Sequence, residues 1–594
     1  MLIILVFATL CVWANLSFSK KKDVLPAQAN INVGLDDWYR NAADSFLQQV
    51  LLLQQIHQRG GSFKQFKSQF IKTRHAFKKM EVLVSYFDAP TYLSLNSQLK
   101  PEVELEVSGF EFIQEPHGLQ VLEALLERKK NFTAGASTIT YEVNRIISTA
   151  GFLKTYHFQK PFTDTGFAKA LQQEIVRITA LGITGFDKPV LTDAIAETAT
   201  ALRGMDAALM AYASGSAFKD DIQNLQVKLE KCGQFITNTY RSFDQFDRLT
   251  FVRNYLQPVF AAASQMISKT DKNITDAPVS VFITSYIDEL YHQPQKGTPE
   301  LVKLGKALFE TPLLSANTMI SCSSCHKQDL AFADTLQRNT GFTFSDTLTR
   351  NTPTLLNVKY HIRFQRDGHL LSMKDQFKEV LNSHLEMGNI SESSLLERVK
   401  MIGEFSEQIQ RVFKVPEDGI LYNMVLDALE AFMRSLISLN SDFDRYMTRT
   451  GDISPAVKNG FNLFMGKAKC GTCHFAPVFN GTIPPYCNKE DNEVIGITTS
   501  NNFKRPLPDK DSGLAQFTRL PMHNQSFKTP GVRNLLKTFP YMHNGSLQTL
   551  DDVLNFYNGG GARINIPHQT MDKTPLNLNK KELQDLKAFL TALN

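Results

Sequence analysis

Two short clusters of cysteine and histidine constrain this chain more than any other feature. Each has the form Cys-x-x-Cys-His, with its ligand residues at Cys322, Cys325 and His326 or at Cys470, Cys473 and His474. The two histidines lie 148 positions apart, and an amphipathic helix is predicted just before each cluster, over 300–310 and 455–467. This repeat of helix and cluster indicates a duplicated small domain.

The spacing of the two clusters points to covalently attached c-type haem. Two thiols at this distance meet the two vinyl groups along one porphyrin edge, and the adjacent histidine reaches the iron from one face. A zinc site built from both cysteine pairs is one alternative, but it would not explain a histidine directly after each second cysteine. A redox dithiol is another, but it would not require two copies. The sequence therefore predicts two haems.

The length of the chain predicts several domains. A chain of 594 residues exceeds one hydrophobic core, so roughly two to four domains are expected. From about residue 36 to 260 the apolar pattern is helical, and neither His75 nor His117 belongs to a ligand cluster, so both are expected at the surface or at helix caps. We expect a mainly α protein without runs of alternating strands. It divides into an N-terminal helical domain of unknown role (20–275) and two haem domains with long loops (276–446 and 447–594).

The N-terminus resembles an export signal. Residues 2–18 are nearly all apolar, and Ser17 and Ser19 supply small residues before a cleavage point, which predicts a signal peptide over 1–19 and a periplasmic protein. An uncleaved N-terminal anchor is the alternative, because no lysine or arginine precedes the apolar stretch. Cys11 falls in this stretch. Cys232 and Cys487 are left outside the haem motifs and are expected to be buried and unpaired, although one disulfide between them is the other reading.

The charge of the chain gives no ground for a nucleic-acid partner. The net charge of +5 is spread over the whole length, and no long run of basic residues stands out past 20–22.

Several runs from about residue 300 onward resemble the bacterial di-haem cytochrome c peroxidases, in the order of that family. They are LGKALF at 304–309, SCSSCH at 321–326, AFAD at 331–334, RNTPTLLN at 350–357, LEMG at 385–388, SDFDRY at 441–446, FKTPGVRN at 527–534 and PYMHNG at 540–545. The resemblance covers the C-terminal half of the chain and leaves the N-terminal half outside it.

The resemblance implies roles for residues around the first haem. The haem on His326 would be the peroxide site, with Gln376 and Glu386 on its open face. A carboxylate there can take a proton from one oxygen of peroxide and deliver it to the leaving oxygen. The second haem, on His474, would receive electrons from a small c-type cytochrome or cupredoxin. The protein is expected as a monomer or as a homodimer, and the sequence does not decide between them.

The resemblance also implies a calcium ion between the two haem domains. Its ligands would be the side chain of Asn351 and the backbone carbonyls of Thr538 and Pro540. These are hard oxygen donors of the kind that calcium prefers, and water would complete the shell.

Three positions depart from the family pattern. No histidine or methionine lies between His326 and His361, so the first iron has no local sixth ligand. The bridging tryptophan of the family falls on Arg366, which leaves electron transfer between the haems to another route such as Phe364 or Tyr360.

The third departure concerns the second haem. The usual methionine ligand falls on Tyr557, which resembles the MauG-like branch of the family. A phenolate is a hard anionic donor that lowers the reduction potential. Met542 is the other candidate ligand, and Tyr557 as a plain packing residue is a third reading.

The sequence therefore predicts a di-haem cytochrome c peroxidase that reduces hydrogen peroxide. One alternative is a MauG-like oxidase that acts on a protein or organic substrate. The other is a di-haem electron carrier without enzymatic activity.

Overall fold

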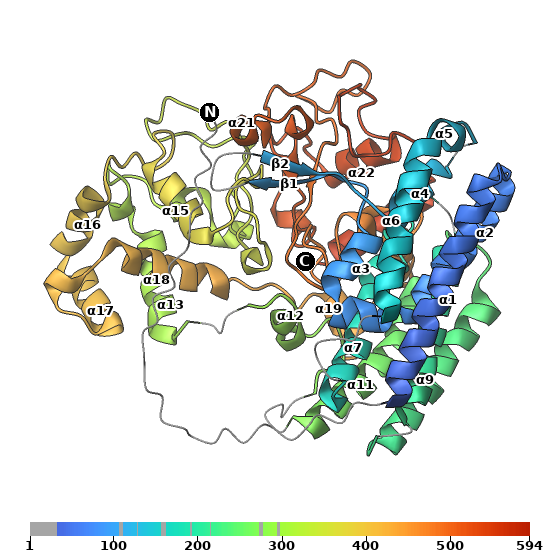
Figure 1. Cartoon of the computed structure of the whole chain (residues 1–594). Helices are drawn as coiled ribbons and strands as arrows, with labels where there is room; N and C mark the ends of the chain where they lie inside the picture. The colour runs from blue at the N-terminus through green and yellow to red at the C-terminus, as the bar shows by residue number, and fades with distance from the viewer. Residues whose placement is uncertain are drawn as a thin grey trace, which may run out of the picture.

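The structure is a computed structural model that describes residues 33–105, 111–127, 129–155, 162–190, 193–213, 216–271, 277–293 and 297–594. The predicted signal peptide, Cys11 and the basic run at 20–22 lie outside these residues. The described chain is mainly helical, as predicted (Figure 1). None of its described helices is long and apolar enough to cross a membrane.

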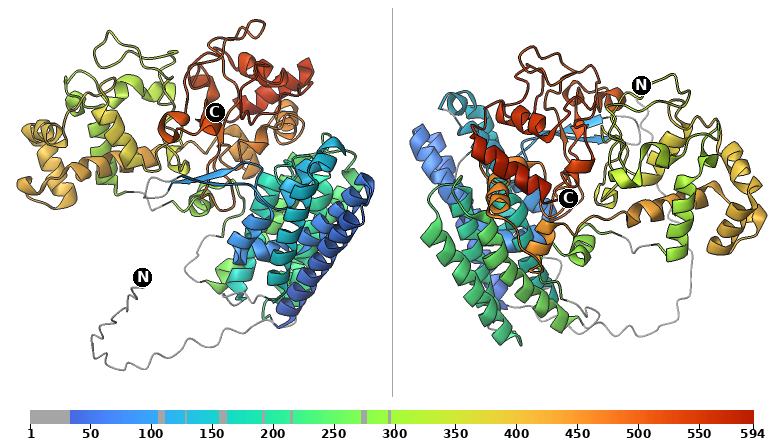
Figure 2. Two further views of the ribbon diagram at one scale, coloured as in Figure 1. Left: turned by 45° about the horizontal axis from the view of Figure 1, so that its top comes forward. Right: turned by 180° about the vertical axis from the view of Figure 1, so that it is seen from behind.

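The N-terminal half forms a bundle of long helices that lie side by side (Figures 1 and 2). Ser62 starts the second of them with a capping box, in which Ser62 and Gln65 each accept a backbone N–H from the other. The helices of this half are α1 (Val33–Gln58), α2 (Phe63–Phe87), α3 (Ala89–Leu95), α4 (Leu119–Leu125), α5 (Lys129–Ala134), α6 (Ala136–Thr155), α7 (Asp164–Arg177), α8 (Ala194–Ala213), α9 (Lys219–Thr239), α10 (Arg248–Phe251) and α11 (Gln257–Thr270), with π-helical turns at Ile178–Gly182 and Val252–Leu256.

A short antiparallel hairpin extends from this bundle towards the region of the cysteine motifs (Figure 2). It consists of β1 (Glu102–Leu105) and β2 (Glu111–Gln114), with Glu102 opposite Gln114. The sequence patterns did not predict it. Lys100, just before β1, forms ion pairs with Asp491 and Glu493, so this segment of the bundle contacts the C-terminal part of the chain.

Two helical regions follow, each built around one cysteine motif. The first contains α12 (Thr284–Leu290), α13 (Pro299–Glu310), α14 (Cys322–Cys325), α15 (Met373–Asn382), α16 (Glu392–Met401), α17 (Gly403–Phe413), α18 (Tyr422–Ser435) and α19 (Asp442–Met447). The second contains α20 (Pro455–Phe464), α21 (Ala515–Thr518), α22 (Leu550–Asn558), α23 (Lys580–Thr591) and the two-residue strands β3 (Asn492–Glu493) and β4 (Phe527–Lys528). Short 3-10 turns lie at Pro312–Leu314, Gln328–Leu330, Val358–Tyr360, Glu417–Gly419, Cys470–Thr472, Pro521–His523 and Leu535–Lys537.

The helices predicted before the two motifs are confirmed as α13 and α20, and they pack alike. Each begins with a proline after a Thr or Ser cap. Gly305 of α13 lies so close to α18 that a Cβ would overlap a backbone oxygen, and Gly460 of α20 meets α23 in the same way. The duplicated unit is therefore a motif helix pressed against a later helix of its own region.

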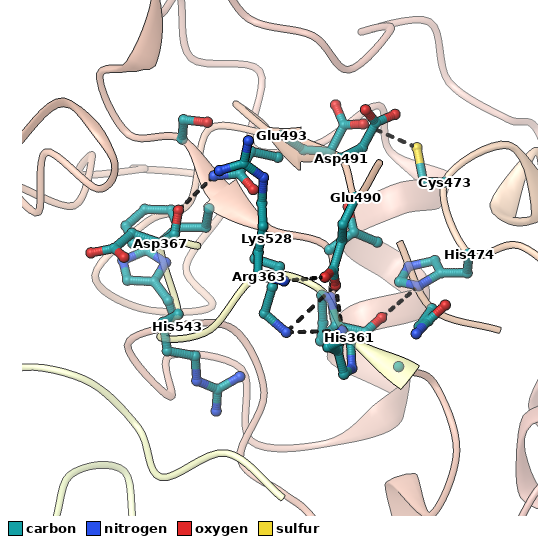
Figure 3. A pocket seen from close by; sticks show the side chains of 18 of the residues that line it. His361, Arg363, Asp367, Cys473, His474, Glu490, Asp491, Glu493, Lys528 and His543 are labelled. Atoms are coloured by element: carbon teal, nitrogen blue, oxygen red, sulfur yellow. Dashed lines mark hydrogen bonds and ion pairs between the residues drawn. The ribbon is translucent and has the colours of Figure 1, made fainter. Parts of the chain in front are cut away.

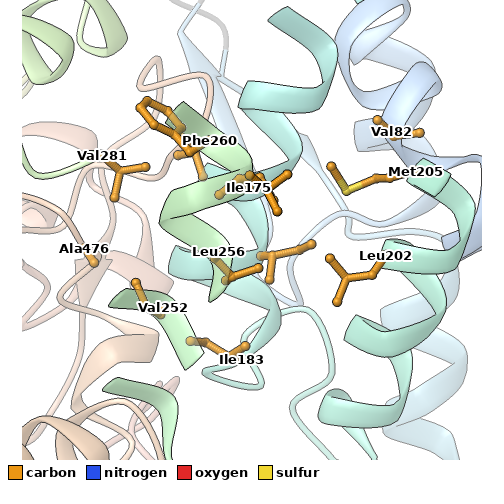
Figure 4. Packing of buried hydrophobic residues seen from close by; sticks show 14 of the residues in the cluster. Val82, Ile175, Ile183, Leu202, Met205, Val252, Leu256, Phe260, Val281 and Ala476 are labelled. Atoms are coloured by element: carbon orange, nitrogen blue, oxygen red, sulfur yellow. The ribbon is translucent and has the colours of Figure 1, made fainter. Parts of the chain in front are cut away.

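The clusters of buried side chains do not follow the division into a helical bundle and two motif regions. One cluster of buried side chains lies within 304–433 and belongs to the first motif region. A larger cluster runs from the bundle into the second motif region, and Figure 4 shows Val281 and Ala476 beside Val252 and Phe260 of the bundle. The bundle thus shares its core with the second motif region. Cys232 and Cys487 are buried and unpaired, as expected.

Candidate haem sites

Both cysteine motifs line one large cavity. Its volume is about 3390 Å³, several times the roughly 300–1,000 Å³ of a usual small-molecule pocket. Residues of the bundle also line it, among them Lys100 and Phe186. Phe186 packs edge-on against Phe475, the residue after the second motif, with ring centroids 5.0 Å apart. The cavity is large enough for more than one cofactor and is closed on one side by the N-terminal half.

The first motif presents its histidine in a defined orientation. The sequence Cys322–Cys325 forms the single helical turn α14, and His326 follows it. His326 Nδ1 lies 2.9 Å from the carbonyl oxygen of Phe332. Burial lowers the pKa of His326, so the ring is neutral, donates from Nδ1 and keeps Nε2 free as a metal ligand.

The second motif repeats this arrangement. His474 Nδ1 lies 2.9 Å from the carbonyl oxygen of Pro530, and burial lowers the pKa of His474 to about 4. Its Nε2 is therefore also free to accept a metal. Two histidines oriented by backbone carbonyls behind Cys-x-x-Cys turns fit two covalent haems, one on each motif.

The two alternatives to haem have less support. The described residues hold no group of three or more His, Cys, Asp or Glu side chains placed to bind a metal ion, so the two cysteine pairs do not form a joint zinc site. Burial also raises the pKa of Cys322 and of Cys470 to about 12. Thiols this weakly acidic lack the thiolate that a redox dithiol requires.

Glu386 lies near the first motif. Its negative charge contributes to the raised pKa of Cys322 and Cys325. Burial raises the pKa of Glu386 itself to about 7, Ser383 lowers it by a hydrogen bond, and the charge of Glu379 raises it further. The carboxyl is thus divided between its two protonation states near neutral pH, which suits an acid–base group.

Gln376 lines the same cavity as Glu386 but is held in place by the chain. It projects from α15, and its side-chain oxygen accepts the backbone N–H of Gln365 at 2.8 Å. Both predicted residues therefore lie on the wall of the cavity that the two motifs line.

Three histidines that follow the first motif, His361, His369 and His384, are candidates to block the first iron, and two of them are held by carboxylates. His361 binds Glu490, which also accepts the backbone N–H of Arg363 at 2.9 Å, and Lys528 Nζ lies 3.1 Å from the ring. Figure 3 shows this partly buried group near His474. Sequence patterns give no sign of Glu490 and Lys528, because both are more than 120 residues from His361 in the chain.

His369 is held even more tightly. Its two ring nitrogens lie 2.6 Å from Asp367 and 2.8 Å from Glu379, and its ring stacks on Phe517 at 3.5 Å. These carboxylates raise the pKa of His369 to about 9 against the opposing effect of burial. A protonated ring held by two carboxylates is a poor iron ligand. His384 is exposed.

Both candidate ligands of the second haem line the cavity. Tyr557 and Met542 pack against the same small hydrophobic cluster around Leu547 and Phe556. Burial raises the pKa of the Tyr557 phenol, and the charges of Cys473 and Cys470 add to this, so the side chain lies near the second motif. The geometry is compatible with either ligand.

Of the two aromatic residues considered for electron transfer between the haems, Phe364 lines the cavity, whereas the Tyr360 hydroxyl donates to Asp288 at 2.7 Å.

The residues implied for calcium do not fit that ion here. Asn351, Thr538 and Pro540 line the same cavity, but Asn351 Oδ1 accepts a hydrogen bond from the Arg366 guanidinium at 2.5 Å. Calcium on that oxygen would lie within about 5 Å of the guanidinium, given Ca–O distances of about 2.5 Å. At that separation the two charges repel by roughly 7 kcal/mol with an effective dielectric constant near 20.

Comparison with known proteins agrees with this geometry. The family described as di-haem cytochrome c peroxidase matches residues 299–452. The methylamine utilization protein MauG of Methylorubrum extorquens is 34% identical over 299 residues, which are 50% of this chain and 78% of that protein. This chain belongs to the di-haem cytochrome c peroxidase family.

Membership in the di-haem cytochrome c peroxidase family implies two covalently bound haems and oxidoreductase chemistry. The cytochrome-c peroxidase IdrP2 of Denitromonas iodatirespirans is 31% identical over 317 residues, covering 51% of this chain and 83% of that protein. Among solved structures, a MauG-like protein associated with microbial copper homeostasis is 27% identical, covers 51% of this chain and 91% of its own, and has a TM-score of 0.45.

Proposed function

We propose that this di-haem protein is a cytochrome c peroxidase that reduces hydrogen peroxide to water at the haem carried by Cys322, Cys325 and His326. The observation that carries the proposal is Glu386, a half-buried carboxyl near this motif whose pKa burial raises to about 7. An electron carrier has no use for such a group, because placing an ionisable carboxyl out of water costs stability. An enzyme that moves protons at neutral pH has such a use.

The haem on the first motif, when bound, would supply the electrons that cleave the peroxide O–O bond. Glu386 in its ionised form accepts the proton of one peroxide oxygen and then returns it to the other oxygen, which leaves as water. Gln376 helps to orient the peroxide with its amide NH2 group, since its side-chain oxygen is already held by the backbone N–H of Gln365. Two protons from solvent and two electrons then convert the remaining oxygen to the second water, so that one peroxide, two protons and two electrons give two water molecules.

The haem on His474 would pass these electrons from a small c-type cytochrome or cupredoxin. With Tyr557 as its second ligand, this haem would have a lower reduction potential. Met542 is the other candidate ligand. Phe364 lies on the wall of the cavity and is the better placed of the two aromatic residues for transfer to the first haem.

The proposal extends to the organisation of the chain. A signal peptide over 1–19 would export the protein to the periplasm. The helical domain over 20–275 would then pack on the haem domain over 447–594 more closely than on the domain over 276–446, in keeping with the shared hydrophobic core.

A MauG-like oxidase is the second candidate, and Tyr557 favours it. The residue lies near the second motif, and MauG itself is 34% identical to this chain over the matched part. Arg366 counts against it, because a charged side chain replaces the aromatic bridge through which two haems would share an oxidised state.

Steady-state turnover of hydrogen peroxide with a reduced c-type cytochrome tests the proposal. The wild-type protein should consume both reactants in the ratio of one peroxide to two electrons. Glu386→Gln should lower turnover by roughly two orders of magnitude or more with both haems retained. Glu392→Gln, at an exposed site six residues away, is the matched control and should keep full activity. A fully active Glu386→Gln protein would remove this residue from the mechanism.

A further inference from the structure

A guanidinium lies in the cavity wall between the two motif regions. Arg366 Nη2 donates to Asn351 Oδ1 at 2.5 Å, and Arg366 Nε donates to the Asn351 carbonyl oxygen at 3.1 Å. Asn351 Nδ2 in turn donates to the Leu336 carbonyl oxygen at 2.8 Å, so both ends of the amide are engaged. The Asn351 backbone N–H donates to the carbonyl oxygen of His543, in the second motif region, at 2.7 Å.

This guanidinium has no carboxylate partner. No Asp or Glu oxygen lies within 4.0 Å of it in the part of the chain that the structure describes. Both of its hydrogen bonds go to neutral oxygens of Asn351. By contrast, the neighbouring Arg350 pairs with Asp367 and with Asp511. Asp334 is near enough for its charge to act on Arg366, but burial and the charge of Arg350 outweigh it and lower the pKa of Arg366 to about 10. A half-buried charge without a directly paired carboxylate is costly, which calls for a functional reason for Arg366.

Arg366 reaches both motif regions. Its own backbone carbonyl oxygen accepts the N–H of Lys528, in the second region, at 2.9 Å, and Arg366 lines the same cavity as His326 of the first region. Lys528 lies two residues before Pro530, whose carbonyl oxygen orients His474. Arg366 is therefore a permanent positive charge between the two haem sites.

We propose that the Arg366 guanidinium takes the place of a divalent cation between the two haem sites, so that this protein holds both haems without calcium. The guanidinium occupies the amide oxygen that calcium would need, and it ties the two motif regions together through Asn351 and His543. A fixed positive charge near the first haem favours its reduced state, because reduction adds a negative charge. The haems, when bound, would bring anionic carboxylates that can act as counterions. The proposal rests on haem attachment alone and not on the peroxide chemistry.

Metal analysis of the intact di-haem protein gives the first test. After dialysis against a calcium chelator, the protein should contain no stoichiometric calcium and keep its absorption spectrum and thermal midpoint. Added calcium should change neither. One tightly held calcium per chain, or a spectrum that depends on calcium, would overturn the proposal. This measurement needs no variant and no peroxide, so it stands whether or not the protein is a peroxidase.

Redox titration of variants gives the second test. Arg366→Gln should lower the midpoint potential of the His326 haem by about 59 mV or more, a tenfold change in a one-electron equilibrium. Arg366→Lys keeps the charge and should restore most of the shift. Arg363→Gln is the matched control, because Arg363 lies on the same loop but donates to the Gly368 carbonyl oxygen. Equal potentials for Arg366→Gln and Arg363→Gln would contradict the proposed role.

Discussion

Glu386 makes a quantitative prediction about stability as well as catalysis. Burial raises its pKa from an ordinary value near 4.5 to about 7. The folded protein therefore holds the carboxyl in its neutral form up to a higher pH than the unfolded chain does. Because ionisation is disfavoured only in the folded state, the residue destabilises the fold at neutral and alkaline pH.

The size and sign of the effect follow from this difference in pKa. Below about pH 4.5 the carboxyl is neutral in both states and costs nothing. Between pH 4.5 and 7 the cost grows, and above pH 7 it reaches its full value of up to roughly 3 kcal/mol. Glu386→Gln keeps the shape of the side chain and cannot ionise. The variant should therefore match the wild type at pH 4 and exceed its stability by about 2–3 kcal/mol at pH 8.

Denaturant unfolding of the di-haem protein at a series of pH values measures this difference. Unfolding is followed by far-UV circular dichroism, and the transition of the first motif region is compared between variants. Glu392→Gln, at an exposed position, should show no such dependence on pH. A constant difference at all pH values, or a Glu386→Gln protein that is less stable at pH 8, would refute the assigned burial.

Three further predictions concern haem attachment, the second haem and packing. Replacing Cys322 and Cys325 together with serine should remove half of the haem that stays with the denatured protein on an acid gel, and a full loss in the wild type on acid–acetone extraction would end the di-haem reading. Tyr557→Phe should raise the midpoint potential of the second haem and abolish any tyrosinate-to-iron absorption band, whereas an unchanged potential and spectrum would exclude Tyr557 as the ligand. Gly305→Ala should destabilise the first motif region by about 1–3 kcal/mol in denaturant unfolding, because the new methyl group meets the Ala428 carbonyl oxygen, and wild-type stability would show that α13 can move away.

The parts of the fold that sequence patterns predicted are those set by local rules. The helix predicted over 300–310 is α13, and the one predicted over 455–467 is α20, which ends three residues earlier at Phe464. Both have an apolar stripe at helical spacing and a capping residue before a proline. The residues of each Cys-x-x-Cys-His motif are neighbours in the chain, so the two haem sites could also be predicted from the sequence.

Features that depend on distant parts of the chain were not predictable in this way. The hairpin of β1 and β2 has strands of only four residues, too short for a reliable alternation pattern. The pairing of His361 with Glu490 and of Lys100 with Asp491 joins residues far apart in sequence. The contact between Arg366 and Asn351 was not predicted for another reason. The family resemblance made Asn351 a calcium ligand, and it treated Arg366 only as the replacement of a tryptophan.

Rapid mixing of the fully oxidised protein with stoichiometric hydrogen peroxide tests the central claim most directly. His361 is held by Glu490, and His369 is held by Asp367 and Glu379, so neither is free to block the first iron. The account predicts a fast change in the Soret band without prior reduction, and its loss or strong slowing in Glu386→Gln. A reaction confined to the half-reduced protein, together with a low-spin bis-histidine signal for the first haem in electron paramagnetic resonance, would contradict it.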